Sequence, residues 1–309
     1  MNRLQANLCL ICVTMFWSTE VVLYACIPDG IPAFATSCVT SLAGAFLLAA
    51  AFYGRALREM RRSWRPLLTG TLCLAALSAA YNTMYLVGLK SFDVTSGAFT
   101  LCMTVVVLPV VLLSIRRRVG LETWTSVGFV SAGILLALGP SLRGGQLGGL
   151  VLMGGGCLLR AVMIVLLADL AKKHDPLTIA ILLEFFAGLI SLGGWLWQDP
   201  RLFLGLPMSR MLIASWSFYS YFIVALAQSF NIMAMSHVTA TNATVVYSLE
   251  IVFSIIWGLV LPASLITPVQ MKPSIVIGAA FIIIGSLTEI FDFRGKRGLH
   301  ENAAQEVAG

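Results

Sequence analysis

The chain has 309 residues, of which 59% are hydrophobic and only 11% are charged. Soluble proteins carry about 25% charged residues, so the composition excludes an ordinary soluble domain and predicts a polytopic membrane protein. The formal net charge of +6 does not point to nucleic acid, because most Lys and Arg residues stand in short clusters between apolar runs.

Ten apolar windows, each long enough to cross a bilayer as a helix, follow one another along the chain. They cover residues 8–27, 33–52, 67–88, 95–115, 123–140, 148–170, 178–197, 213–234, 241–261 and 274–292. No connection between them is long enough to hold a soluble domain. The sequence therefore predicts an all-α integral membrane protein with ten transmembrane helices, followed by a disordered tail over residues 293–309.

The first window contains a carboxylate, Glu20, within the stretch FWSTEVVLY. A cleavable signal peptide is one interpretation of this window, but Glu20 interrupts its apolar run and Tyr24 is bulky next to the cleavage position. Nine similar windows follow. We therefore expect the segment to be retained as the first helix.

Basic residues are divided unevenly between the two sets of connections. If the N-terminus is inside, the clusters at 55–65, 116–118 and 172–173 all lie on the inner side, whereas each outer connection holds few basic residues. Cytoplasmic loops carry the excess of Lys and Arg. We expect a multi-pass protein of the plasma (inner) membrane with both termini in the cytoplasm.

An internal repeat relates the two parts of the chain. The segment SGAFTLCMTVVVLPVVL from Ser96 resembles TNATVVYSLEIVFSIIW from Thr241, which aligns the fourth window with the ninth. Residues 1–145 and 146–292 are then two five-helix repeats. Because five is odd, the repeats enter the membrane from opposite sides. Inverted-topology repeats are typical of secondary transporters, which bind substrate near the midplane between them.

Three segments carry a resemblance to a known family: MFWSTEVVLYACIPDGIPAF in the first helix and its turn, TSGAFTLCMTVVVLPVVL in the fourth, and TATNATVVYSLEIVFSIIWG in the ninth. With their order and spacing, the chain resembles a ten-helix, EamA-type member of the drug/metabolite transporter superfamily over residues 5–292. The resemblance implies a small-metabolite transporter, usually an exporter or efflux antiporter of bacterial inner membranes, that works by alternating access.

The chain departs from the family pattern at several positions near the expected cavity. Ser18 stands where a Gly is usual, and Thr40 or Ser41 stands in place of a common Arg. Ile251 replaces a frequent Pro, and Arg160 stands where the sixth helix often has a Trp. The resemblance therefore implies no particular substrate.

Four ionisable residues lie near the middle of their windows: Glu20, Arg160, Glu184 and Glu250. Charged side chains are costly in lipid, so we expect all four to face a wet cavity or one another. Arg160 is expected to pair with Glu184, because the sixth and seventh helices form one hairpin; a substrate role for Arg160 stays open.

The three acids, Glu20, Glu184 and Glu250, are the predicted proton-coupling residues. Aromatic and apolar neighbours of Glu20 favour the neutral form of a carboxyl group, which suits a proton carrier. Small multidrug exporters related to the family also carry a coupling Glu in their first helix. A structural role is the alternative, above all for Glu250, which would then bond helix termini or backbone.

Aromatic and amide side chains gather around the predicted positions of these acids. Tyr81, Asn82 and Tyr85 cluster on the third helix, and Tyr221, Gln228 and Asn231 recur on the eighth. Aromatic faces near acids suit an amine or an organic cation, although polar side chains also simply bond neighbouring helices. The predicted substrate-binding residues are Trp17, Glu20, Tyr81, Asn82, Tyr85, Arg160, Gln228, Asn231 and Tyr247.

Several other classes of protein lack support in the sequence. It has no phosphate-binding GxxxxGK[ST] motif, so ATP is not expected to drive it, and no metal or other cofactor is predicted. The cysteines lie within apolar windows and are expected to pack there. We predict a transporter rather than an enzyme, with a small-molecule substrate, protons and the lipid bilayer as partners and a monomeric or homodimeric state. A membrane enzyme acting on a lipid or isoprenoid and a passive channel remain alternatives.

Overall fold

The computed structural model describes residues 1–309 except 29, 90–102, 118, 139–146, 207, 262–271 and 291–309. The described part is helical and contains no strand. Its elements are α1 (Arg3–Trp17), α2 (Glu20–Ala25), α3 (Ala33–Leu89), α5 (Thr104–Ser114), α6 (Leu121–Leu138), α7 (Leu147–Ala171), α8 (Pro176–Gln198), α9 (Pro200–Leu204), α10 (Arg210–Phe218), the π-helix η2 (Tyr219–Ala227), α11 (Gln228–Met235), α12 (Ala240–Tyr247), α13 (Leu249–Val260) and α14 (Pro273–Ile290).

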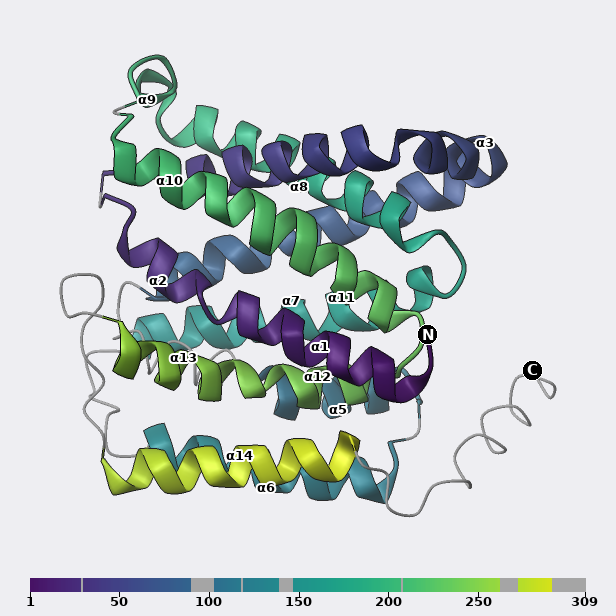
Figure 1. The fold of residues 1–309 in the computed structure, drawn as a ribbon, viewed down its shortest axis with the longest axis vertical. Coiled ribbons are helices and arrows are strands. Elements are labelled where there is room, and N and C mark those ends of the chain that lie inside the picture. The colour runs from purple at the N-terminus through teal and green to yellow at the C-terminus, as the bar shows by residue number, and fades with distance from the viewer. Residues whose placement is uncertain are drawn as a thin grey trace.

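The helices run side by side along one common direction (Figure 1). In that view α3 and α8 lie at the top and α6 and α14 at the bottom, with α1, α7, α12 and α13 between them. Within the described residues, five helical segments are long and apolar enough to cross a membrane: 33–85, 151–171, 176–198, 210–235 and 240–260.

Every predicted window contains helical residues, because each combines high hydropathy with few helix breakers. The start of the fourth window and the predicted tail lie outside the described residues. The count of ten spans and the inverted repeat stay predictions.

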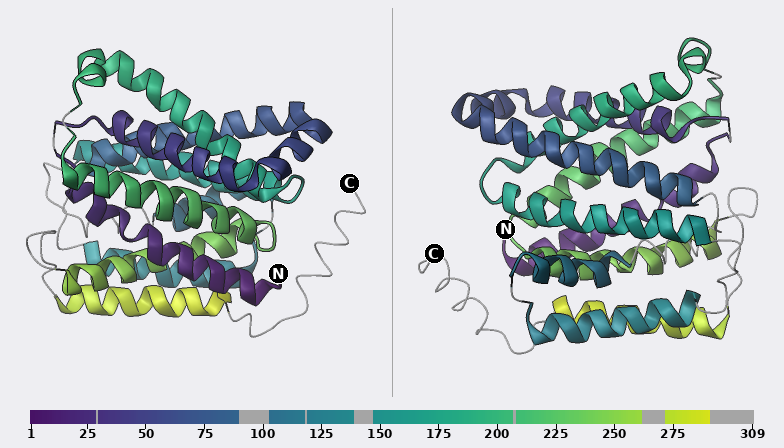
Figure 2. Two further views of the ribbon diagram at one scale, coloured as in Figure 1. Left: turned by 45° about the horizontal axis from the view of Figure 1, so that its top comes forward. Right: turned by 180° about the vertical axis from the view of Figure 1, so that it is seen from behind.

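The longest element, α3, joins two of the predicted windows. Its 57 residues would measure about 85 Å if straight, far more than the roughly 30 Å of a bilayer core. Non-helical backbone angles at Phe52 and Ser63 interrupt it, and the chain turns back at this point (Figure 2). Pro66 follows in the first turn of the second part, where its missing N–H costs little.

Two other predicted helices are broken next to an acidic residue. The first predicted helix is interrupted at Ser18 and Thr19, so that Glu20 begins α2, and the ninth is interrupted at Ser248, two positions before Glu250. The hydroxyl of Ser18 donates to the carbonyl of Met15 at 2.7 Å, and that of Ser248 donates to the carbonyl of Val245 at 2.6 Å. Such bonds compete with the helical pattern.

Both breaks are tied to other helices. The indole N–H of Trp257 in α13 donates to the Ser18 hydroxyl at 2.8 Å. The hydroxyls of Ser248 and Ser286 in α14 lie 3.1 Å apart. These contacts hold the backbone in position at Ser18 and Ser248, where the backbone hydrogen bonds of the helix are interrupted.

Turns of the predicted inner side gather at the end of the molecule where the N-terminus lies, on the right in Figure 1. Here both terminal guanidinium nitrogens of Arg117 donate to the Asp169 carboxylate, at 3.0 and 2.6 Å. The imidazole of His174 lies 3.0 Å from a carboxylate oxygen of Glu59. Each contact joins a residue of the first predicted repeat to one of the second.

Candidate substrate cavity

A cavity lies among these helices, with polar side chains in its wall. The space between its lining atoms, including the part open to solvent, is about 790 Å³. Ten of the residues selected from the sequence line it: Trp17, Glu20, Tyr81, Asn82, Arg160, Glu184, Gln228, Asn231, Tyr247 and Glu250. Chain segments far apart in sequence therefore bring the predicted residues to one place.

The remaining selected residue, Tyr85, is only 3% exposed and is not among the lining residues. The reason is the close approach of α3 and α7. A Cβ atom on Gly156 of α7 would lie 3.6 Å from the Tyr81 carbonyl oxygen and 3.9 Å from the Tyr85 amide nitrogen. The two helices close on each other here, so Tyr85 packs beside the cavity rather than in its wall.

Glu20 is held by a residue that the sequence analysis did not select. The hydroxyl of Tyr219 donates to a carboxylate oxygen of Glu20 at 2.6 Å. Tyr219 begins the π-helix η2, whose turns are wider than those of an α-helix. The selected stripe assumed α-helical spacing, and its first member, Tyr221, is 52% exposed. The sequence analysis missed Tyr219 because it applied α-helical spacing to a segment that forms a π-helix.

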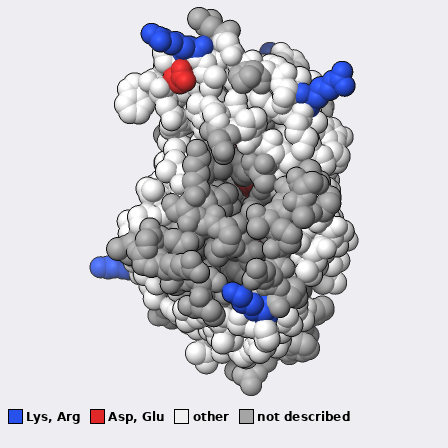
Figure 3. All heavy atoms as spheres, turned by 90° about the vertical axis from the view of Figure 1, so that its left-hand side faces the viewer, with Lys and Arg blue, Asp and Glu red and all other residues white. Residues whose placement is uncertain are grey.

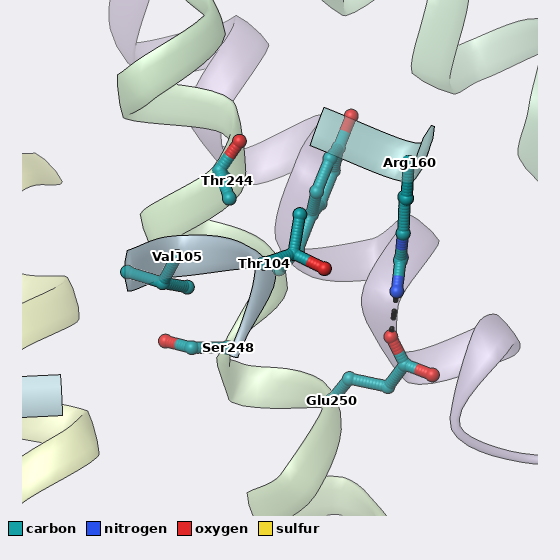
Figure 4. Close-up of a pocket in the computed structure, with 7 residues that line it drawn as sticks. Thr104, Val105, Arg160, Thr244, Ser248 and Glu250 are labelled. Carbon is teal, nitrogen blue, oxygen red and sulfur yellow. Dashed lines mark ion pairs between the residues drawn. The ribbon is translucent and has the colours of Figure 1, made fainter. Parts of the chain in front are cut away.

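Arg160 is paired with Glu250, not with Glu184 as expected. The Nη2 atom of Arg160 lies 3.7 Å from Oε2 of Glu250, and the two side chains are 8% and 5% exposed (Figure 4). The prediction of an Arg160–Glu184 pair is wrong, because it rested on neighbouring helices in the chain. The helix break at Ser248 places Glu250 across from α7 instead.

Three aromatic rings surround the guanidinium of Arg160. Its central carbon lies 5.8 Å from the ring centroid of Trp17, 5.7 Å from that of Tyr81 and 5.9 Å from that of Tyr247. All three distances are within the range of cation–π attraction, about 6 Å. The rings of Trp17 and Tyr247 also contact each other, with centroids 5.2 Å apart.

Glu184 lies in another part of the wall. It is 7% exposed, and its hydrogen-bonding neighbour is Ser41 of α3, which also lines the cavity. Ser41 is one of the two positions at which the family resemblance led us to expect an Arg. In this chain the neighbour of the Glu184 carboxyl group is therefore the Ser41 hydroxyl instead of a guanidinium.

A smaller cavity adjoins the first. It is lined by Thr104, Val105, Arg160, Thr244, Tyr247, Ser248 and Glu250. Figure 4 shows the Arg160–Glu250 pair from this side. Since Arg160, Tyr247 and Glu250 line both cavities, they form a shared wall between them.

Seen from the end of the molecule opposite the N-terminus, an acidic side chain is visible below the outermost atoms (Figure 3). Among the described residues, no three His, Cys, Asp or Glu side chains gather in a way that would hold a metal ion.

Comparison with known proteins identifies a family. Residues 147–288 match the EamA-like transporter family. A solved structure described only as "Crystal structure of protein" has the same fold, with a TM-score of 0.73, 16% sequence identity, and coverage of 93% of this chain and 98% of that chain. No curated protein matches by sequence.

The family match confirms the resemblance over residues 147–288. The likeness to the solved structure is one of fold alone and covers nearly the whole chain. The apolar helices and the family together make this a multi-pass membrane protein. Residues 147–288 of the chain match the model of the EamA-like transporter family, part of the drug/metabolite transporter superfamily.

Proposed function

We propose that the protein is a proton-linked secondary transporter that exports small organic metabolites by alternating access. The observation that carries this proposal is the charge balance of the cavity. Its described lining residues include three carboxyl groups, Glu20, Glu184 and Glu250, and one guanidinium, Arg160. Intramembrane ionisable residues that share a cavity mark substrate or proton paths in membrane proteins.

Each acid has a different setting, which suggests a division of roles. Glu250 faces Arg160, whereas Glu20 and Glu184 have the hydroxyls of Tyr219 and Ser41 as neighbours. A hydroxyl can donate to an ionised carboxyl group and accept from a protonated one, so it can stay bonded through a change of protonation state. Glu20 and Glu184 are therefore the proposed carriers of the proton, and Glu20 alternates between a proton and the cargo.

The cavity wall supplies groups for binding the cargo. Aromatic faces of Trp17, Tyr81 and Tyr247 stand beside the amides of Asn82, Gln228 and Asn231. These groups suit a small molecule with both apolar and polar parts, such as an amino acid or an organic cation. Protonation of Glu20 from outside the cell would weaken its hold on an amine and release the cargo there.

Proteoliposomes test this proposal against an enzyme or a passive channel. We would prepare the wild-type protein in vesicles with an acidic lumen and supply a mixed panel of labelled amino acids and organic cations. A proton-linked exporter inserted in either direction should accumulate its cargo above the outside concentration, and a protonophore should abolish the accumulation. Uptake that only equalises the two concentrations would support a channel and contradict the proposal.

A further inference from the structure

The three rings around Arg160 and the carboxylate of Glu250 form what we call the cation cage. Its rings come from the end of α1 (Trp17), from α3 (Tyr81) and from the end of α12 (Tyr247). Each ring centroid lies 5.7–5.9 Å from the guanidinium carbon. Aromatic rings converging on one positive charge are the usual way in which proteins bind organic ammonium ions.

In this structure the cation in the cage belongs to the chain itself. The guanidinium of Arg160 lies among the rings and 3.7 Å from Glu250, which is longer than a direct hydrogen bond. The rings and the carboxylate therefore both surround this charge. Because Arg160 is tethered, its effective concentration at the cage is high, and a free cation would have to displace it.

The Trp17 and Tyr247 rings of the cage are also held by contacts with residues other than Arg160. The hydroxyl of Tyr247 donates to the side-chain oxygen of Asn231 in α11, and the amide nitrogen of Asn231 donates to Gln228 at 3.4 Å. Trp17 packs against the Tyr247 ring and adjoins Ser18, which receives the bond from Trp257. The rings should keep their places if the arginine is replaced.

We infer that Arg160 is a specificity-determining residue that fills the cation cage and thereby excludes small organic cations from the cage. This inference rests on the proposed transport function for its biological meaning. At the cage it favours neutral, zwitterionic or anionic cargo, and it leaves Glu20 as the group that holds an amine. It also explains the role of an arginine at a position where the family resemblance led us to expect a tryptophan.

The test is the binding of tetramethylammonium to the purified full-length protein in detergent, measured by titration calorimetry. Arg160→Gln should empty the cage and bind tetramethylammonium at least tenfold more tightly than the wild type. Arg160→Lys, the matched control that keeps a tethered cation, should remain as weak as the wild type. Adding Trp17→Leu to Arg160→Gln should remove most of the gain.

Equal affinity of the wild type and Arg160→Gln, whether weak or tight, would overturn the inference. If Arg160→Gln does not fold, Arg160→Gln combined with Glu250→Gln removes both charges together and should still bind tetramethylammonium more tightly than Glu250→Gln alone. The absence of that difference would also overturn it. Binding in detergent needs no proton gradient, so the two proposals can be told apart. The inference about Arg160 can be overturned while proton-driven transport is still observed, and it can be supported while proton-driven transport is not observed.

Discussion

At the scale of single residues, the contact between Glu20 and Tyr219 answers why a carboxylate stands in the first apolar window. The helix break at Ser18 and Thr19 places Glu20 at the start of α2, and Tyr219 of η2 reaches it from another helix. Glu20 and Tyr219 are both half-buried, and a hydrogen bond to a charged group contributes more than one between neutral groups. The pair is thus built into the cavity wall.

Tyr219→Phe removes only the hydroxyl that donates to Glu20. Hydrogen bonds to charged groups contribute about 1.5–3 kcal/mol, so we expect proton-driven accumulation to fall roughly tenfold while the protein still folds. The measurement is uptake into vesicles with an acidic lumen. Tyr221→Phe, which changes an exposed ring on the same π-helix, is the matched control and should transport normally. Equal uptake by both variants would show that Tyr219 does not act on Glu20.

The Arg160–Glu250 pair makes a second prediction at this scale. Removing one partner of a buried ion pair leaves an uncompensated charge and costs about 3–5 kcal/mol, whereas removing both costs much less. Glu250→Gln should therefore lower the thermal unfolding temperature in detergent more than Glu250→Gln together with Arg160→Gln. Additive losses in the double variant would argue that the two side chains do not interact.

At the scale of helices, much of the architecture could be predicted from hydropathy, whereas the breaks within helices could not. Long apolar windows must form helices in lipid, because backbone groups have no water to bond. The breaks at Ser18 and Ser248 depend on hydroxyls that bond their own backbone, and serine does this in some helices and not in others. The π-helix at 219–227 left no mark in the periodicity.

The helix pair α6–α14 gives a prediction about packing. A Cβ atom added at Gly133 of α6 would lie 2.5 Å from the Gly278 carbonyl oxygen and 2.8 Å from Ile282, whereas nothing lies within 4 Å of a Cβ at Gly128. Gly133→Val must push the two helices apart, at a cost of about 1–3 kcal/mol.

Thermal unfolding in detergent checks this expectation. Gly133→Val should unfold several degrees below the wild type. Gly128→Val, the same change in the same helix, should stay close to the wild type. A similar loss in both variants would mean that the effect comes from valine in a helix rather than from the contact with α14.

At the scale of the whole molecule, the sequence located the site better than it located the contacts within it. Glu20, Arg160, Glu184 and Glu250 share one cavity, because charges that must avoid lipid have few places to go. The partner of Arg160 was predicted wrongly, since it depends on how α7 and α13 are rotated toward each other, and hydropathy does not report rotation.

Contacts at the N-terminal end join the two predicted repeats across their boundary. Arg117 bonds Asp169, and Glu59 contacts His174. The proposed alternating access would require that such contacts form and break as the halves move. They are polar contacts at the ends of helices, which suits reversible contact better than a continuous apolar interface does.

The most direct test of the account compares wild type with Glu20→Gln in proteoliposomes. The substitution removes the ability to exchange a proton and keeps the shape of the side chain. Asp199→Asn, an equivalent change at the start of α9 and outside the cavity, is the control, because asparagine also caps helices. Accumulation driven by the pH gradient and exchange of cargo without a gradient are measured on the same vesicles.

The account predicts that Glu20→Gln loses gradient-driven accumulation at least tenfold while exchange without a gradient persists, and that Asp199→Asn retains both. Normal gradient-driven accumulation by Glu20→Gln would contradict it. Glu20 would then be a packing partner of Tyr219, and the proton would have to be carried elsewhere or not at all.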